Sequence, residues 1–135
     1  MSAPLTVVNP RELGSPRGFS HGLIVPPGSR LLFVAGQTAT DEAGRIPSDG
    51  FCDQFDRSLA RVLAVVREAG GKPQHIVRLT VYVTNMDEYR DSRTALGDIW
   101  KRHMGSHYPA MALVEVTSLV DKATTVEIEA TAALP

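Results

Sequence analysis

The sequence predicts a two-layer α+β domain, with two helices on one face of a mostly antiparallel sheet. Three observations support this fold class. Apolar residues recur at spacings of three and four over residues 51–69, the spacing changes to two over residues 76–84, and glycine and proline separate several shorter apolar runs. In chain order these segments give β-β-β-α-β-α-β-β, a single domain spanning residues 1–135.

Length and composition restrict the class of protein. The 135 residues suffice for one hydrophobic core but not for two. The 14 Lys and Arg residues nearly balance the 15 Asp and Glu residues, so we expect no nucleic-acid partner. No apolar run approaches the roughly 20 residues of a membrane span, so we expect no membrane partner. A single cysteine, Cys52, favours a reducing compartment, and we expect a cytoplasmic protein.

The first three strands are expected near the N-terminus. Residues 5–8 form a short strand that Asn9-Pro10 ends. Residues 21–25 and 30–36 flank Pro26-Pro27-Gly28-Ser29, a turn of hairpin length, which predicts that these two strands are antiparallel neighbours.

The clearest helix covers residues 51–69. Ser48 and Asp49 are suited to cap its start, and Gly70-Gly71 permit the left-handed backbone that ends many helices. Its apolar stripe consists of Phe51, Phe55, Leu59, Val62, Leu63 and Val66.

The remaining elements are a strand over residues 76–84, a helix over residues 88–104, and strands over residues 111–116 and 124–131. Alternation divides the strand residues between two faces of the sheet. The set expected to face the helices comprises Val77, Leu79, Val81, Ala112, Val114, Val126 and Ile128, and a second set lies on the open face. That set mixes apolar bulk with charges of both signs, as a self-association surface does. It comprises Arg78, Thr80, Tyr82, Met111, Leu113, Glu115, Glu127 and Glu129.

Four stretches resemble the RidA (YjgF, L-PSP endoribonuclease-like) family, and the similarity extends over residues 16–132. They are residues 30–37, which end in Ala-Gly-Gln where the family has Ser-Gly-Gln; residues 77–84, Val-Arg-Leu-Thr-Val-Tyr-Val-Thr; Pro109-Ala110 followed by Val-Glu-Val at 114–116; and the closing strand at 126–130.

This resemblance implies a chorismate-mutase-like fold and a homotrimer with a small-molecule ligand in each inter-subunit cleft. It also implies a reaction, because members of the family hydrolyse enamines and imines such as 2-aminoacrylate to a keto acid and ammonia. The family binds the substrate carboxylate with an Arg, and Met111 stands at that position here. Such a bidentate contact requires a planar guanidinium, so the substrate is expected to differ.

Further site residues follow from the same resemblance. Glu127 matches the glutamate that orients the attacking water and is the candidate catalytic residue. Phe19 matches the aromatic residue of the cleft, without a hydroxyl group, and Ala35 replaces the serine. The predicted substrate-binding residues are Phe19, Ser20, Ala35, Gly36, Gln37, Arg93, Met111 and Leu113.

Two cations are candidates to replace the missing Arg. Arg93 falls on the second helix near the position of a cleft Asn in the family, and Arg17 lies beside Phe19. The alternative for Arg93 is an exposed helix residue paired with a neighbouring Glu or Asp. For Glu127 the alternative is pairing with Lys or Arg on a trimer face.

Other motifs are assigned no catalytic role. Gly18-Phe19-Ser20-His21-Gly22 has the pattern of a nucleophile elbow. That motif requires a strand before the serine and a helix after it, whereas here a loop precedes Ser20 and a strand follows. No carboxylate or thiol stands at ligand spacing from the four histidines, so we expect no metal and no cofactor. The basic residues Lys101-Arg102-His103 suit the C-terminal end of a helix dipole.

Two functions remain open from the sequence. The first is an enamine or imine deaminase-like hydrolase acting on a small reactive metabolite that lacks a carboxylate or is held by another cation such as Arg93. The second is a non-catalytic trimeric protein, in which Met111 and Leu113 make the former anion site apolar and suited to a different small molecule.

Overall fold

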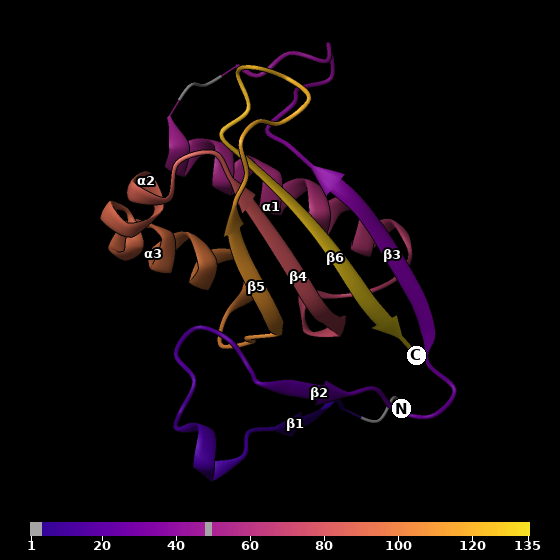
Figure 1. Ribbon diagram of the computed structural model, residues 1–135. Coiled ribbons are helices and arrows are strands. Elements are labelled where there is room, and N and C mark those ends of the chain that lie inside the picture. Colours follow the sequence, from indigo (N-terminus) through magenta and orange to yellow (C-terminus); the bar gives the residue numbers. More distant parts are fainter. Residues whose placement is uncertain (1–3, 48–49) are drawn as a thin grey trace.

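The computed structural model describes residues 4–47 and 50–135, and Figure 1 shows its two layers. A four-stranded sheet has the order β3-β6-β4-β5, in which β4 and β5 are parallel and the other neighbours antiparallel. Three helices pack on one face of the sheet, and a separate two-stranded ribbon lies across one end of it. The sheet strands are β3 (Arg30–Gln37), β4 (Ile76–Val83), β5 (Ala110–Glu115) and β6 (Val126–Leu134).

The predicted α+β fold and its element order are confirmed. The helices are α1 (Phe51–Glu68), α2 (Met86–Asp91) and α3 (Arg93–Met104), and short 3-10 turns lie at Arg11–Leu13 and Pro73–His75. The ribbon consists of β1 (Thr6–Val8) and β2 (Gly22–Ile24). None of the helices in the described part of the chain is both long and apolar enough to cross a membrane.

Helix α1 supplies the centre of the core. All six residues of its predicted apolar stripe are buried, and Leu59, Val62 and Val66 are fully inaccessible. Gly71, just after α1, packs so closely against Leu134 that an added Cβ would lie 2.5 Å from Leu134 Cδ2. The predicted caps Ser48 and Asp49 lie outside the described residues.

The second predicted helix is two helices with a break at Ser92. Asn85 caps α2, because its side-chain oxygen accepts hydrogen bonds from the N–H groups of Asp87 and Glu88. Together α2 and α3 form the crossover that two neighbouring parallel strands require, here β4 and β5.

The predicted pairing of the second strand with the third is wrong. Strand β2 pairs with β1, whereas β3 pairs with β6. The physical reason lies in the intervening turn: Ser29 N–H donates to the Pro26 carbonyl over 3.2 Å, and Gly28 has a φ of +82°. Proline followed by a positive-φ glycine is a type II turn, which splays the flanking strands instead of twisting them into a hairpin.

Two predictions of which residues face the helices are also wrong. Ile76 is fully buried and Val77 only partly, because a register shift between Ile76 and Arg78 reverses the alternation at the start of β4. In β5, Met111 and Leu113 pair with the buried residues Leu79 and Val81. They therefore face the helices and contact the core, while the exposed Val114 lies on the open face.

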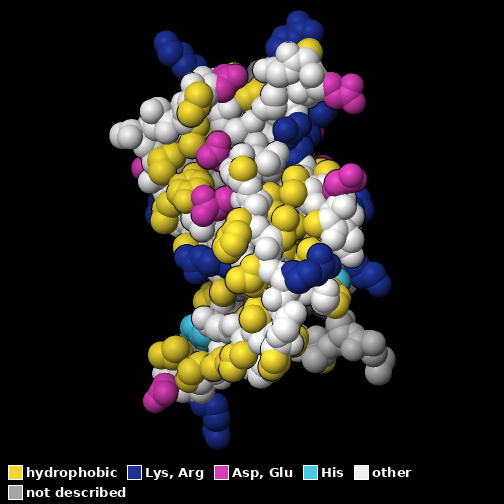
Figure 2. Space-filling model, turned by 90° about the vertical axis from the view of Figure 1, so that its right-hand side faces the viewer, with side chains coloured by type: hydrophobic (Ala, Val, Ile, Leu, Met, Phe, Trp, Pro, Cys, Tyr) yellow, Lys and Arg dark blue, Asp and Glu magenta, His cyan; other side chains and the backbone are white. Residues whose placement is uncertain are grey.

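The open face nevertheless has the mixed character that the sequence predicts. Tyr82 donates a hydrogen bond to Glu129 Oε1 over 3.1 Å, and burial followed by the Glu129 contact raises the Tyr82 pKa. Leu31, Phe33 and Val114 supply exposed apolar surface, with Phe33 74% exposed. Figure 2, which looks onto the β3 side of the molecule, shows hydrophobic side chains gathered among charges there. Such a surface suits contact between protein copies.

Candidate functional site

A pocket of about 330 Å³ opens between α3, β5 and the loop before β2. Met111 and Leu113 contribute to its lining from β5, and Trp100 and Leu96 from α3. Trp100 stacks on Tyr108 with ring centroids 6.0 Å apart and donates a hydrogen bond to the His107 carbonyl, which fixes both rings. The result is a mostly apolar recess of a size suited to a small molecule.

Three cations stand around this recess: Arg17, Arg93 and Lys101. No acidic residue lines it within the described chain, and none of the ion pairs found there involves these three side chains. The Arg93 guanidinium instead lies over the Tyr89 ring, 5.8 Å from its centroid. Both candidate cations, Arg17 and Arg93, thus line the pocket. Arg93 is exposed, as its alternative interpretation has it, but the ion pair of that alternative is absent from the described residues.

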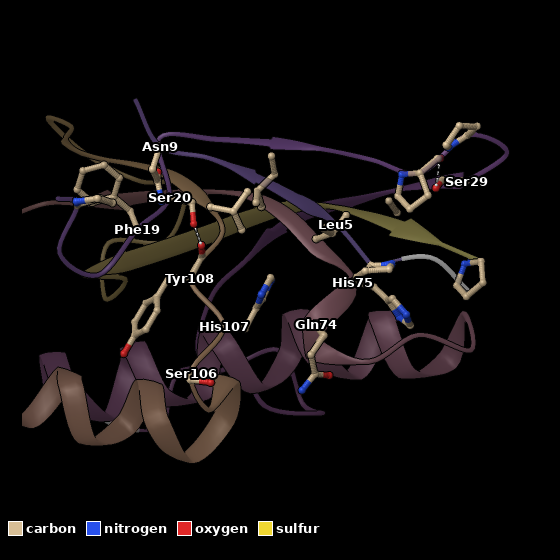
Figure 3. Close-up of a pocket in the computed structure, with 18 of the residues that line it drawn as sticks. Leu5, Asn9, Phe19, Ser20, Ser29, Gln74, His75, Ser106, His107 and Tyr108 are labelled. Carbon is tan, nitrogen blue, oxygen red and sulfur yellow. Dashed lines mark hydrogen bonds between the residues drawn. The ribbon is translucent and has the colours of Figure 1, made fainter. Parts of the chain in front are cut away.

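Phe19 and Ser20 line a second, adjacent cavity of about 1010 Å³ between the β1–β2 ribbon and the segment before β5 (Figure 3). Ser20 is 8% exposed; its hydroxyl donates to the Tyr108 carbonyl over 2.5 Å and its N–H donates to the Pro109 carbonyl over 3.1 Å. Because Tyr108 lines both cavities, the two are neighbours. Ser20 thus holds the loop before β2 against the start of β5. Its hydroxyl contacts a backbone carbonyl and not a basic side chain, as a catalytic nucleophile would.

A second group of predicted site residues lies elsewhere in the chain, where β3 and β6 pair. Ala35 and Gly36 fall in a bulge between the pairs Val34–Ala130 and Gln37–Ile128. At Gly36 the backbone approaches Glu127 so closely that a Cβ would lie 2.7 Å from its Oε2. The Gln37 side chain donates to the Ala35 carbonyl and accepts from Arg61. Only a glycine leaves room for the Glu127 carboxylate in this position.

The Endoribonuclease L-PSP family matches residues 11–134, almost the whole chain. The chain belongs to this family, the Rid (YjgF) proteins.

Among curated Rid relatives, the 2-iminobutanoate/2-iminopropanoate deaminase of Capra hircus is 28% identical over 115 residues, which are 84% of this chain and 78% of the goat protein. Among solved structures, the Rid protein YyfB from Yersinia pestis, whose function is unknown, is 32% identical with a TM-score of 0.87, covering 98% of this chain and 100% of YyfB. E. coli TdcF with bound serine is 30% identical with a TM-score of 0.69, covering 90% and 92%.

In this Rid protein the predicted site residues therefore fall into two groups. Arg93, Met111 and Leu113 share the pocket beside α3, with Phe19 and Ser20 next to it. Ala35, Gly36, Gln37 and Glu127 lie on β3 and β6 and line neither cavity.

Sequence reasoning missed several residues of the pocket, among them Lys101, Tyr89 and Tyr108. Lys101 was attributed to the helix dipole alone, although it lies two turns after Arg93 on the same helix and so on the same side. Tyr89 and Tyr108 line the pocket as aromatic side chains. The position of Tyr108, directly before the Pro109-Ala110 motif, was the available signal.

Proposed function

We propose that this Rid protein hydrolyses the C=N bond of a small imine or enamine in the pocket between α3 and β5. The observation that carries the proposal is the pocket itself: an apolar floor with three cations around it and no acidic lining residue in the described chain. Such a site favours a small anion with an apolar side chain. Two relatives bear names of this activity, the goat deaminase and E. coli TdcF, a putative reactive intermediate deaminase.

The substrate carboxylate is assigned to Arg93. The Arg93 guanidinium lies over the Tyr89 ring and has no carboxylate partner among the described residues. Arg93 lines the same pocket as Met111. Met111 in place of an arginine leaves the floor apolar, so it contacts the substrate side chain. The substrate class is then an imino acid whose apolar side chain packs on Met111 and Leu113.

The reaction adds water across the C=N bond. The water oxygen bonds to the imine carbon, the nitrogen takes up protons and leaves as ammonia, and the carbon becomes a carbonyl. Glu127 orients and deprotonates the attacking water. Because Glu127 lies with Gly36 and Gln37 away from the pocket of its own chain, a second copy supplies it, in a cytoplasmic homotrimer with sites at its seams.

The proposal is tested with imino acids generated in situ by an amino-acid oxidase in the presence of semicarbazide. Semicarbazide traps the imine faster than the keto acid, so hydrolysis by the protein lowers the rate of semicarbazone formation. Imines of alanine, 2-aminobutanoate and leucine are compared with an imine that lacks a carboxylate. Faster loss of the imino acids with the protein than without it, and no effect on the carboxylate-free imine, is the expected result. Equal rates with and without protein for all of them would overturn the proposal.

A non-catalytic binding role has one observation in its favour. Met111 and Leu113 make the floor apolar at the position where the family resemblance implies a carboxylate-binding arginine. Absence of turnover together with a rise in Tm on adding small carboxylic acids would assign the pocket to binding alone.

The substitution Met111→Arg tests the binding-only role, in a wild-type protein that shows no turnover of its own. If the rest of the cleft is intact, a guanidinium at this position binds the carboxylate bidentately, and 2-aminoacrylate hydrolysis rises at least about 10-fold. The control Met111→Lys keeps a positive charge without the planar fork and gives a smaller rise.

A further inference from the structure

Among the unpaired strand edges of the described chain, those of β3 and β2 face the same question of a partner. Strand β3 pairs on one side with β6, and no strand of the described residues lies along its other side. Strand β2 likewise pairs on one side with β1 alone. An eight-residue edge such as β3 presents a row of backbone donors and acceptors that readily pairs with another strand.

The start of β2 is held away from the β3 edge of its own chain. Ser20, two residues before β2, is fixed by two hydrogen bonds to Tyr108 and Pro109, at the start of β5. Strands β5 and β3 are the opposite edges of the sheet, as Figure 1 shows. Three strand spacings of about 4.8 Å separate them, so roughly 14 Å lie between these edges.

This anchor is incompatible with a hairpin between β2 and β3 of one chain. A two-residue turn at Pro27-Gly28 would pair Ile24 with Leu31, and continuing that register would place Ser20 beside Ala35. Ser20 cannot lie beside Ala35 on β3 and beside Pro109 on β5 of the same copy. The type II turn described above also directs β2 away from its own β3.

Ser20 can lie beside Pro109 of its own copy and beside Ala35 of another copy when two copies take part. We propose that the β1–β2 ribbon of one copy pairs with the free edge of β3 in a second copy, so that the chains exchange this ribbon. Exchange of an identical element between protomers needs no new kind of contact, because the two segments that would pair within one chain pair between two chains instead. A short hinge that resists closure favours such exchange, and Pro26-Pro27-Gly28 is one.

The exposed apolar side chains agree with this arrangement. Eight large hydrophobic side chains are exposed in the described chain, and five of them lie on the three strands involved. Ile24 is 58% exposed and Leu31 53%. These residues are covered when the ribbon of a second copy lies along β3. The five are Val7, Val8, Ile24, Leu31 and Phe33.

Exchange also accounts for the division of the site. It places Phe19 and Ser20 of the donating copy beside Ala35 and Gly36 of the accepting copy, next to its Glu127. The pocket of the donor is thereby joined to the carboxylate of its neighbour. This consequence rests on the proposed function; the exchange itself rests on the strand edges and the Ser20 anchor.

The test is a cross-link between β2 and β3. The double variant Ile24→Cys/Leu31→Cys, in a Cys52→Ser background, is treated with a short bismaleimide and run on a denaturing gel. Exchange predicts that most cross-linked protein migrates at the mass of two or three chains. The two single-cysteine variants give the background. Adding Pro27→Asn to the double variant creates an Asn-Gly turn that closes a hairpin, and shifts the product toward one chain mass.

Light scattering on the same samples separates this inference from the proposed trimer. Cross-links within single chains only, or none, in a trimeric sample would overturn the exchange and leave the proposed function intact. Cross-linked multimers in a protein without hydrolase activity would support the exchange and remove the proposed function instead.

Discussion

The carboxylate of Glu127 lies directly over the backbone of Gly36, where a Cβ would come within 2.7 Å of Oε2 and 2.9 Å of Cδ. The bulge at Ala35 and Gly36 brings Gly36 and Glu127 together, and bulges often lie beside functional sites. The absence of a side chain at position 36 therefore sets the position of the proposed catalytic carboxylate.

Gly36→Ala should lower kcat without unfolding the protein. The new methyl group displaces the flexible end of Glu127, and a misplaced catalytic group costs about 10–100-fold in rate. The free energy of unfolding, from urea titration, should change by less than about 1 kcal/mol. The control is a double-variant cycle with Glu127→Gln. Additive losses in kcat would mean that Gly36 does not act through Glu127.

Arg93→Ala should raise the KM for imino acids about 10–100-fold, the effect of losing one charge-assisted hydrogen bond of 1.5–3 kcal/mol. Arg90→Ala is the matched control, because Arg90 pairs with Asp87 at the surface and does not line the pocket. Steady-state kinetics of both variants provide the measurement. Equal KM values for the two variants would assign the substrate carboxylate to another cation.

Gln54→Leu should destabilise the fold by about 1–3 kcal/mol. The fully buried Gln54 side chain donates to the Ala123 carbonyl and accepts from Thr125 N–H, and leucine leaves both groups without it. Arg57→Ala on the same helix removes an exposed ion pair with Asp53 and should change the free energy of unfolding by less than about 0.5 kcal/mol. Chemical denaturation of both variants compares the two effects, and a small change for Gln54→Leu would show that water replaces its contacts.

His75 should make stability depend on pH. Burial, then the charges of Lys72 and His107, lower its pKa below 6.5, and its neutral Nδ1 accepts a hydrogen bond from the Lys72 N–H over 2.9 Å. A lowered pKa means that this stabilisation is complete above about pH 6.5 and is lost as the pH falls through the pKa of the folded state.

NMR titration of the His75 ring gives the pKa directly. The free energy of unfolding of the wild type relative to His75→Ala should decrease as the pH falls from about 7 to about 5. A constant difference over that range would contradict the assignment.

The sequence was sufficient where one residue pattern dominates. The stripe from Phe51 to Val66 predicts a helix because its apolar residues all lie on one side, and that helix is the core of the molecule. The family resemblance likewise placed Arg93, Met111 and Leu113 together, and they share one pocket.

Side-chain direction in β5 was beyond the sequence, because Ala110 to Val114 is apolar throughout and has no alternation to read. Its register depends on the parallel pairing with β4, which forms through the crossover by α2 and α3. The register shift at Ile76 and the turn at Pro27-Gly28 are also backbone features. Hydrophobic patterns do not reveal them, although proline followed by glycine was a signal for type II geometry.

The open edge of β3 links folding to abundance. A strand completed by a neighbouring chain is whole only when neighbours are present, so the midpoint of thermal unfolding rises with protein concentration. At high dilution the same edge, with Phe33 beside it, becomes the place where aggregation begins. If β3 is completed in this way, assembly is a condition of solubility as well as of the proposed chemistry.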